Sequence, residues 1–410
     1  MRGRMRGRIA MVMSTKVRVI FALWVLLFVN YLDRVAISFA GPSMMADLSL
    51  SPAQFGIILS SFGVGYMLAQ VPGGLLADKW GAKPVLVVGP LLWAFFTGMT
   101  GLVATLTGFV VVRLCFGISE GLSAASFYKA IGDHFDSQGR ARAAAISTTA
   151  ITLAPAFAGA VIGQLVGEFG WQAMFAMMAV PALLTAATTY FFIPARRENA
   201  ASSTSAEDEA SFREVLTRPS LWLLSVSQFG YNFVTWGYLG WMPSYLVLAR
   251  GIDLKTIGIL ASVPFLFAFC GLLVGGWLGS GRLHRSRPYL VVGAYLIAGA
   301  SLVVAFLAET MAMAVAGLSS TAFNLHVALG PKSAIMLDLA PDRFRAAYVG
   351  VVSTVGQAAG AAAPAVIGFL VSATGSFASG FGLMAAALFV AALTMLALTP
   401  QLSKRAMATA

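Results

Sequence analysis

The stretch Thr107-Gly-Phe-Val-Val-Val-Arg113-Leu-Cys-Phe-Gly-Ile-Ser-Glu120-Gly-Leu-Ser-Ala-Ala-Ser-Phe-Tyr-Lys-Ala-Ile131 decides the class of fold. It exceeds the roughly 20 apolar residues that cross a bilayer as a helix, yet it contains two charges. A charge at mid-membrane depth costs at least about 2.5–3.5 kcal/mol. Arg113 and Glu120 project from one helix face, about 10 Å apart along the axis. Each therefore needs a partner on another helix, a ligand or water. A charged pair that only joins helices is the structural alternative.

The composition places the whole chain in a membrane. Of its 410 residues 59% are hydrophobic and 10% are charged, whereas soluble domains carry about 25% charged residues. The mean hydropathy is +0.83. Within a bilayer every backbone N–H and C=O group must be paired inside the protein. With only short connections between the apolar runs, we predict that each run is a helix. The candidate spans are 19–40, 53–76, 84–103, 107–131, 143–167, 172–193, 220–248, 256–278, 289–308, 311–337, 346–373 and 378–399.

The distribution of basic residues predicts the orientation. Outside the spans, every lysine and arginine except Arg250 and Lys255 lies on the side of the two termini. By the positive-inside rule both termini are cytoplasmic, and a multi-pass protein of the inner membrane is expected. The net charge of +11 is then a feature of topology, and no nucleic-acid partner is expected.

An internal repeat divides the chain into halves at an offset near 202. Four matches in the same order indicate duplication, and transporters are commonly built from such repeats, with the site between the halves. The fold class predicted is all-α, with twelve transmembrane helices in two pseudo-symmetric six-helix bundles. The matches are Asn30-Tyr31 with Asn232-Phe233, Gly73–Leu76 with Gly275–Leu278, Gly139–Ala144 with Asp342–Ala347, and Ala160–Gly163 with Ala365–Gly368.

The expected domain boundaries follow from the spans and from one polar break. The polar segment carries serines followed by Glu207-Asp208-Glu209 and is typical of a flexible connector. The domains are a cytoplasmic tail (1–18), an N-terminal six-helix bundle (19–193), a cytoplasmic linker (194–219), a C-terminal six-helix bundle (220–399) and a cytoplasmic tail (400–410).

A charged loop follows the second span. Its sequence, Gly74-Leu-Leu-Ala-Asp78-Lys79-Trp-Gly81-Ala-Lys83, resembles the loop motif of the major facilitator superfamily. We expect Gly74, Asp78, Lys79, Gly81 and Lys83 to form a conformational latch on the cytoplasmic face. In the second half Ser280 replaces the acid, so that copy should latch weakly.

Further motifs resemble one family within that superfamily. Three stretches are similar to the anion:cation symporter family. They are Asn30-Tyr-Leu-Asp33-Arg34, the stretch around Gln70–Gly74, and Arg113 followed by Gly117 and Glu120 in the fourth span. The resemblance covers essentially the whole chain. It implies that Arg34 binds a substrate carboxylate and that Asp33 and Glu120 carry coupling protons. Arg113 would be a second intramembrane cation that holds Glu120 or lines the path.

The chemistry of these side chains agrees with those roles. A guanidinium keeps its charge and offers a planar fork to a carboxylate, and buried acids are common coupling groups. A permanent Asp33–Arg34 ion pair is the structural alternative, but neighbours on a helix point about 100° apart.

The repeat also suggests residues for the second half of the site. Asp33 and Arg34 map onto Thr235 and Trp236, and Glu120 maps near Ala322. We therefore expect a polar and aromatic surface opposite the charged one. The further substrate-binding candidates are Tyr31, Asn232, Trp236, Tyr238, Asn324, His326 and Gln357. For His326 a packing role is an equal alternative, and Lys129 and Lys332 are expected to extend their amines to the membrane surface.

The function predicted is proton-coupled symport of a small organic anion by alternating access. Sugar acids, aromatic carboxylates and small dicarboxylates all fit one arginine, although Ile151 and Gln357 replace polar contacts of polyol-binding relatives. A uniporter, an exchanger, or a drug or lipid exporter are alternatives, and a receptor is a more distant one. No enzyme is expected, because no nucleophile or nucleotide motif is present. No metal or cofactor is expected either, since Cys115 and Cys270 lie within spans without metal-ligand spacing. One chain suffices, so a monomer is expected.

Overall fold

The computed structural model describes residues 14–195, 216–280, 286–340 and 345–408. The basic tail before residue 14, most of the expected linker, Asp342-Arg343-Phe344 of the repeat and the last two residues lie outside this part.

The described residues form long helices and no strand. Ten described segments are long and apolar enough to cross a membrane. One of them is in α6, which contains two of the expected spans and changes direction at Gly170, where φ is 79°. Helix α8 lies outside those ten but is 26 residues long and coincides with an expected span. The elements are α2 Thr15–Asp47, α3 Pro52–Trp80, α4 Ala82–Thr100, α5 Leu106–His134, α6 Ser137–Phe192, α8 Pro219–Ser244, η1 Tyr245–Ala249, α9 Leu254–Ser280, α10 Arg287–Leu307, α11 Met311–Leu339, α12 Arg345–Thr374 and α13 Phe377–Ala408.

Polar side chains define where several helices begin. Ser51 and Gln54 form a capping box at the start of α3, which satisfies backbone N–H groups that the helix itself cannot pair. The side chains of Thr105 and Thr310 cap α5 and α11 by accepting the backbone N–H of Gly108 and of Met313. Both of these helices have 29 residues, so the caps align them, and Glu120 corresponds to Leu325. The offset of 202 placed it near Ala322, which is wrong by about one helical turn.

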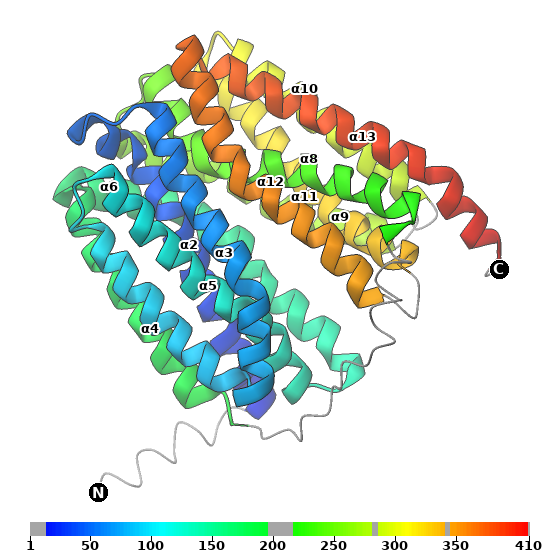
Figure 1. Cartoon of the computed structure of the whole chain (residues 1–410). Coiled ribbons are helices and arrows are strands. Elements are labelled where there is room, and N and C mark those ends of the chain that lie inside the picture. Colours follow the sequence, from blue (N-terminus) through cyan, green and yellow to red (C-terminus); the bar gives the residue numbers. More distant parts are fainter. Residues whose placement is uncertain (1–13, 196–215, 281–285, 341–344, 409–410) are drawn as a thin grey trace, which may run out of the picture.

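The helices are arranged in two groups (Figure 1). Helices α2 to α6 lie in one group and α8 to α13 in the other. The groups contact each other mainly through α3 with α12 and α6 with α9. We call the end where Thr15 starts α2 the terminus end and the other the far end. The ribbons converge at the far end and diverge towards the terminus end.

Small residues allow the groups to pack closely near the far end. A methyl group on Gly56 would lie 2.6 Å from the carbonyl oxygen of Pro364, so the two backbones are in contact. Ser60 Oγ accepts a hydrogen bond from the Ala365 N–H at 2.9 Å. This contact, called the seam below, consists of Gly56, Ser60 and Gly63 of α3 with Ala361, Pro364 and Ala365 of α12.

Candidate functional site

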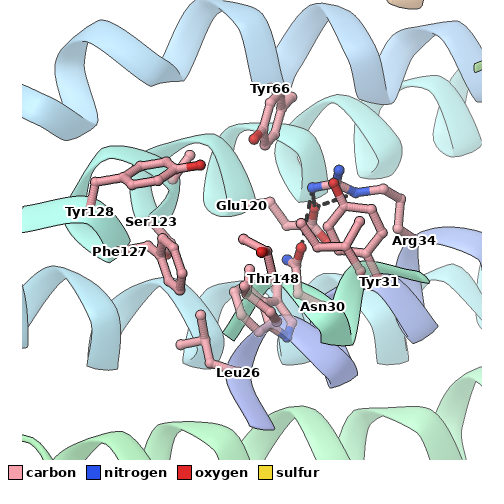
Figure 2. Close-up of a pocket in the computed structure, with 14 residues that line it drawn as sticks. Leu26, Asn30, Tyr31, Arg34, Tyr66, Glu120, Ser123, Phe127, Tyr128 and Thr148 are labelled. Atoms are coloured by element: carbon pink, nitrogen blue, oxygen red, sulfur yellow. Dashed lines mark hydrogen bonds and ion pairs between the residues drawn. The ribbon is translucent and has the colours of Figure 1, made fainter. Parts of the chain in front are cut away.

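A cavity of about 110 Å³ lies among the helices of the first group. Figure 2 shows Asn30, Tyr31 and Thr148 near Arg34 and Glu120, with Ser123 and Tyr128 farther along the cavity. On α2 and α5 these two are the lining residues nearest the far end, so they form the inner end of the cavity. Tyr128, towards the terminus end, is 64% exposed. The lining residues are Leu26, Leu27, Asn30, Tyr31, Arg34, Tyr66, Trp93, Glu120, Ser123, Ala124, Phe127, Tyr128, Thr148 and Ile151.

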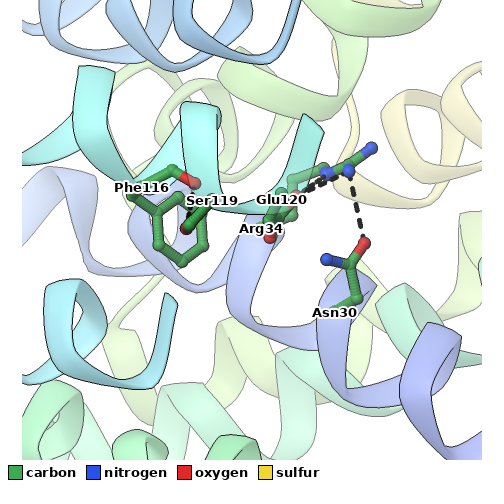
Figure 3. Close-up of polar contacts among 5 residues, drawn as sticks. All are labelled: Asn30, Arg34, Phe116, Ser119 and Glu120. Carbon is green, nitrogen blue, oxygen red and sulfur yellow. Dashed lines mark hydrogen bonds and ion pairs between the residues drawn. The ribbon is translucent and has the colours of Figure 1, made fainter. Parts of the chain in front are cut away.

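Arg34 and Glu120 form a buried ion pair (Figure 3). The Nη2 and Nε atoms of Arg34 donate to the same oxygen, Glu120 Oε2, at 2.6 and 3.1 Å. Nη2 also donates to Asn30 Oδ1 at 3.2 Å. The side chains of Arg34 and Glu120 are 4% and 0% exposed. Arg34 therefore holds Glu120, whereas the sequence analysis considered Arg113 for that contact.

Aromatic rings surround the Arg34 guanidinium. Its central carbon lies 4.5 Å from the ring centre of Tyr31, 5.0 Å from Phe62 and 4.9 Å from Tyr66. Trp236, at 5.3 Å, comes from the second group of helices. Such contacts stabilise a cation that is largely removed from water through the electron-rich ring faces.

Asp33 and Arg113 lie apart from the cavity. Thr97 Oγ1 donates to Asp33 Oδ2 at 3.3 Å. Asp33 Oδ1 and Arg113 Nε are buried and have no hydrogen-bond partner in the described part of the chain. The Arg113 guanidinium packs over Phe116 at 4.5 Å. Asp33 makes its hydrogen bond to α4 while the adjacent Arg34 pairs with α5, which excludes a permanent bond between these neighbours in this structure.

Two further candidates lie on α8. Trp236 contacts Arg34 across the interface, as given above. Asn232 accepts a hydrogen bond from Gln228 Nε2 at 3.4 Å and packs against Gly356 of α12. It is half-buried at the interface side of the second group, outside the cavity lining.

The structure does not bring Tyr238, Asn324 or His326 to the cavity. The Tyr238 hydroxyl is buried and donates to the Leu318 carbonyl at 3.0 Å. Asn324 Nδ2 donates to the Ser320 carbonyl at 2.8 Å. His326 Nδ1 lies 2.8 Å from the carbonyl oxygen of Ala322 in its own helix. Each of these polar groups has a backbone carbonyl as its partner. The sequence repeat gives the position of a residue along a helix but not the direction of its side chain, so it could not predict these bonds. Gln357 is half-buried on α12, also outside the lining.

The latch residues lie at the terminus end. Asp78 pairs with Lys129 of α5 at 3.4 Å, within its own group of helices. Gly81 has φ 85° and is the single residue between α3 and α4, a backbone conformation that glycine adopts without steric cost. The Lys83 amine lies 5.0 Å from the Tyr190 ring centre. Gly74 is half-buried, and Lys79 is exposed in the last turn of α3.

The two membrane lysines differ. Lys129 extends its amine to Asp78, whose side chain is exposed at the terminus end. Lys332 is 4% exposed, and its amine lies 3.3 Å from the ring centre of Tyr231. It is therefore buried in the second group rather than directed to the membrane surface.

Several cavity residues were not selected from the sequence. Tyr66 and Tyr128 are single tyrosines within apolar helices, and Ser123 and Thr148 are isolated hydroxyls. Tyr66 lies four residues after Phe62, and their ring centres are 5.8 Å apart. Aromatic pairs at this spacing share a helix face and were the signal available. Ile151 does line the cavity, where the sequence analysis placed it.

The arrangement offers one strong anion-binding group that is already occupied. A planar guanidinium binds a carboxylate through parallel N–H donors, and Glu120 uses those donors here. An external carboxylate that binds the same Nε and Nη2 donors must displace Glu120, and a proton on Glu120 would remove its charge from the competition.

Comparisons with known proteins identify the family of the chain. The family model of the Major Facilitator Superfamily matches residues 23–331. A hexuronate transporter of Bacillus subtilis (strain 168) is 27% identical, with 89% of this chain and 90% of the relative covered. A probable L-galactonate transporter of Escherichia coli (strain K12) is 30% identical, with 85% and 82% covered.

A solved structure shares the fold. A bacterial homologue of the human lysosomal transporter Spinster, in an inward-facing and unoccupied conformation, superposes with a TM-score of 0.81. It is 20% identical, and the match covers 96% of this chain and 98% of that one. The chain therefore belongs to the Major Facilitator Superfamily, as its loop motif predicted, and is a membrane transporter rather than an enzyme.

Proposed function

We infer that the protein is a proton-coupled symporter of a small organic anion that works by alternating access. The observation that carries this proposal is the pairing of Arg34 with Glu120 at the inner end of the cavity. Binding of a proton to Glu120 and binding of a carboxylate to Arg34 favour each other. The proton neutralises the Glu120 charge that competes for Arg34, and the bound carboxylate takes away the Arg34 charge that keeps Glu120 ionised. By thermodynamic linkage anion affinity then rises as pH falls, and anion binding takes up a proton.

The second coupling acid is Asp33, which the cavity does not reach in this state. Glu120 lines the cavity, which opens towards the terminus end. Asp33 does not line it and accepts its hydrogen bond from Thr97 of α4. In the proposed cycle Asp33 exchanges its proton when the far end is open. Glu120 exchanges its proton from the cavity, so the two acids differ in the side from which they are reached.

A sugar acid is the substrate class that fits best. Asn30, Ser123, Tyr128 and Thr148 can hydrogen-bond to hydroxyl groups along the cavity. Relatives named for hexuronate, L-galactonate, galactarate and D-glucarate support this choice. Ile151 makes the cavity less polar on one side, which favours a substrate with fewer hydroxyls there.

The orientation proposed is that of a protein of the inner membrane with both termini in the cytoplasm. The basic residues of the connections support it. With that orientation the cavity lies on the cytoplasmic side of the ion pair and the seam on the outer side. The state described is then inward-facing, and import follows from an inward proton gradient.

Uptake into proteoliposomes tests this function. Radiolabelled glucuronate, galactonate and galactarate are supplied with and without an imposed proton gradient. We expect gradient-driven accumulation of at least one acid by the wild type. In Glu120→Gln the gradient should give no accumulation, while exchange of labelled for unlabelled anion persists, because glutamine has no proton to release. The exposed acid Glu168 gives the matched control, Glu168→Gln, which should behave as wild type. Equal accumulation by wild type and Glu120→Gln would contradict the proposal.

A further inference from the structure

The rings around Arg34 belong to two different layers. Tyr31 and Tyr66 line the cavity. Phe62 and Trp236 pack against each other at 6.1 Å between ring centres. Phe62 precedes Gly63 of the seam, and on α3 it lies one turn nearer the far end than Tyr66. The Phe62–Trp236 pair thus adjoins the end of the seam that is nearer Arg34.

Trp236 reaches this layer only because residue 360 has no side chain. A methyl group on Gly360 would contact Cδ1 of the indole directly, and it would lie 2.6 Å from Nε1 and 3.0 Å from Cγ. Gly360 adjoins Ala361, a member of the seam. Any side chain at position 360 must therefore displace the indole from its place beside Arg34 and Phe62.

We propose that Phe62 and Trp236 form a floor that closes the anion cavity towards the far end, and that Gly360 is the positioning residue that admits Trp236 to it. From the terminus end towards the far end the order is cavity, Arg34–Glu120 pair and floor, and the seam begins beside the floor and continues to the far end. The proposal rests on the proposed function in that Arg34 is taken as the anion-binding group, and its test takes the far end as the outer side of the membrane.

The floor links access to binding through one guanidinium. The N–H groups of Arg34 donate to Glu120 and Asn30, at the place where an anion would bind. The same guanidinium contacts both rings of the floor, Phe62 and Trp236. Phe62 belongs to the first group of helices and Trp236 to the second. When the groups separate at the far end, the two rings part, and Arg34 becomes accessible from that side instead.

The floor can be tested by thiol labelling without any anion. The reporter is Thr148→Cys, a cavity residue, in a background where Cys115 and Cys270 are alanine. A charged, membrane-impermeant maleimide is added at the far side of intact cells. We expect Trp236→Ala to raise the labelling rate at least about fivefold, in keeping with the loss of roughly 1 kcal/mol of ring contacts. Trp236→Phe should label at the wild-type rate.

Two glycines of α12 give the matched pair of variants. Gly360→Ala should raise labelling as Trp236→Ala does. A methyl group on Gly356 would meet only the Asn232 and Gln228 side chains, 2.7 Å away, so Gly356→Ala should not raise it. Melting temperatures are measured for every variant, and if Trp236→Ala does not fold, the glycine pair decides the outcome. Wild-type labelling in folded Gly360→Ala, or equal increases in both glycine variants, overturns the proposal.

Failure of the floor and failure of the proposed function give different results. Labelling in the predicted pattern, together with no carboxylate binding by the wild type, would remove the anion site and leave the floor. Carboxylate binding that depends on Arg34, together with unchanged labelling in Trp236→Ala, would do the reverse.

Discussion

Arg34 and Trp236, which the sequence repeat pairs with each other, are in contact, with the guanidinium carbon 5.3 Å from the indole ring centre. A contact between repeat-related residues lies on the pseudo-twofold axis, which is where such transporters place their substrate site. The first half contributes a charge at this position and the second half a ring. The repeat is therefore symmetric in backbone and asymmetric in chemistry at its centre.

The first prediction concerns the shape of the cation. Arg34→Lys keeps the charge but loses the two-pronged contact that Nε and Nη2 make. Carboxylate affinity, measured by isothermal titration, should fall about 10- to 100-fold, the value expected for losing a charge-assisted hydrogen bond. Lys129→Arg, at the surface pair with Asp78, serves as a control that should not change affinity. Unchanged affinity in Arg34→Lys would mean that substrate binding depends on the charge at position 34 and not on the shape of the cation.

A second prediction concerns the seam. In Gly56→Ala the added methyl group lies 2.6 Å from a backbone oxygen, too close to be accommodated without separating α3 from α12. Spin labels at Leu102 and Thr374, exposed residues at the far end, should report a larger share of long distances. Gly276→Ala has nothing within 4 Å and should give the wild-type distribution. Identical distributions in all three proteins would show that the seam can yield locally.

Lys332 gives a prediction about stability. Its buried amine packs on Tyr231 and forms no ion pair with an acid among the described residues. Burying a charge costs desolvation free energy, and even a buried ion pair can often be replaced by apolar residues of similar volume with no loss, or with a gain of about 1–4 kcal/mol. Lys332→Met should therefore melt at the same or a higher temperature in detergent. Lys332→Arg adds bulk and should melt lower. A large loss of stability in Lys332→Met would reveal an anionic partner of the lysine.

Asp136 gives the clearest pH dependence outside the membrane. It caps α6, accepting the Gly139 N–H at 2.7 Å, and pairs with Lys16 at 3.2 Å. These contacts, the Gly139 N–H most of all, lower the pKa of the Asp136 carboxyl below its usual value. A lowered folded-state pKa means that the stabilisation is present above the unfolded-state value and is lost as pH falls through the folded one.

The matched variants separate the cap from the charge. Asp136→Ala should lower the melting temperature at pH 7, and Asp136→Asn should restore part of it, because asparagine also caps helices. The difference between wild type and Asp136→Asn should shrink as pH is lowered below the usual aspartate pKa of about 3.9. A difference that does not depend on pH would mean that the charge contributes nothing.

The fold and the first half of the site could be predicted from the sequence, and the physical reasons are local. Spans are read from runs of apolar residues, and charges such as Arg34 and Glu120 stand out within them. Their pairing was not predicted, since it joins residues 86 positions apart. The alternative partner Arg113 was equally plausible on spacing alone.

The second half was harder to predict because it carries no unmistakable charge. Mapping by the repeat paired Trp236 with Arg34, and the two side chains are in contact. The same mapping misaligned α11 by about a turn, and it could not show that Asn324 and His326 bond to their own helix. Polar side chains that find a backbone carbonyl one turn earlier leave no trace in the hydrophobic pattern.

The exchange of Glu120 for a substrate carboxylate is the central claim, and proton uptake on binding tests it most directly. Purified protein in weak buffer near pH 7 is titrated with a carboxylate that binds, and the pH change is recorded. The account predicts net proton uptake by the wild type, and markedly less by Glu120→Gln at the same occupancy. Saturable binding at Arg34 without proton uptake by the wild type would contradict it.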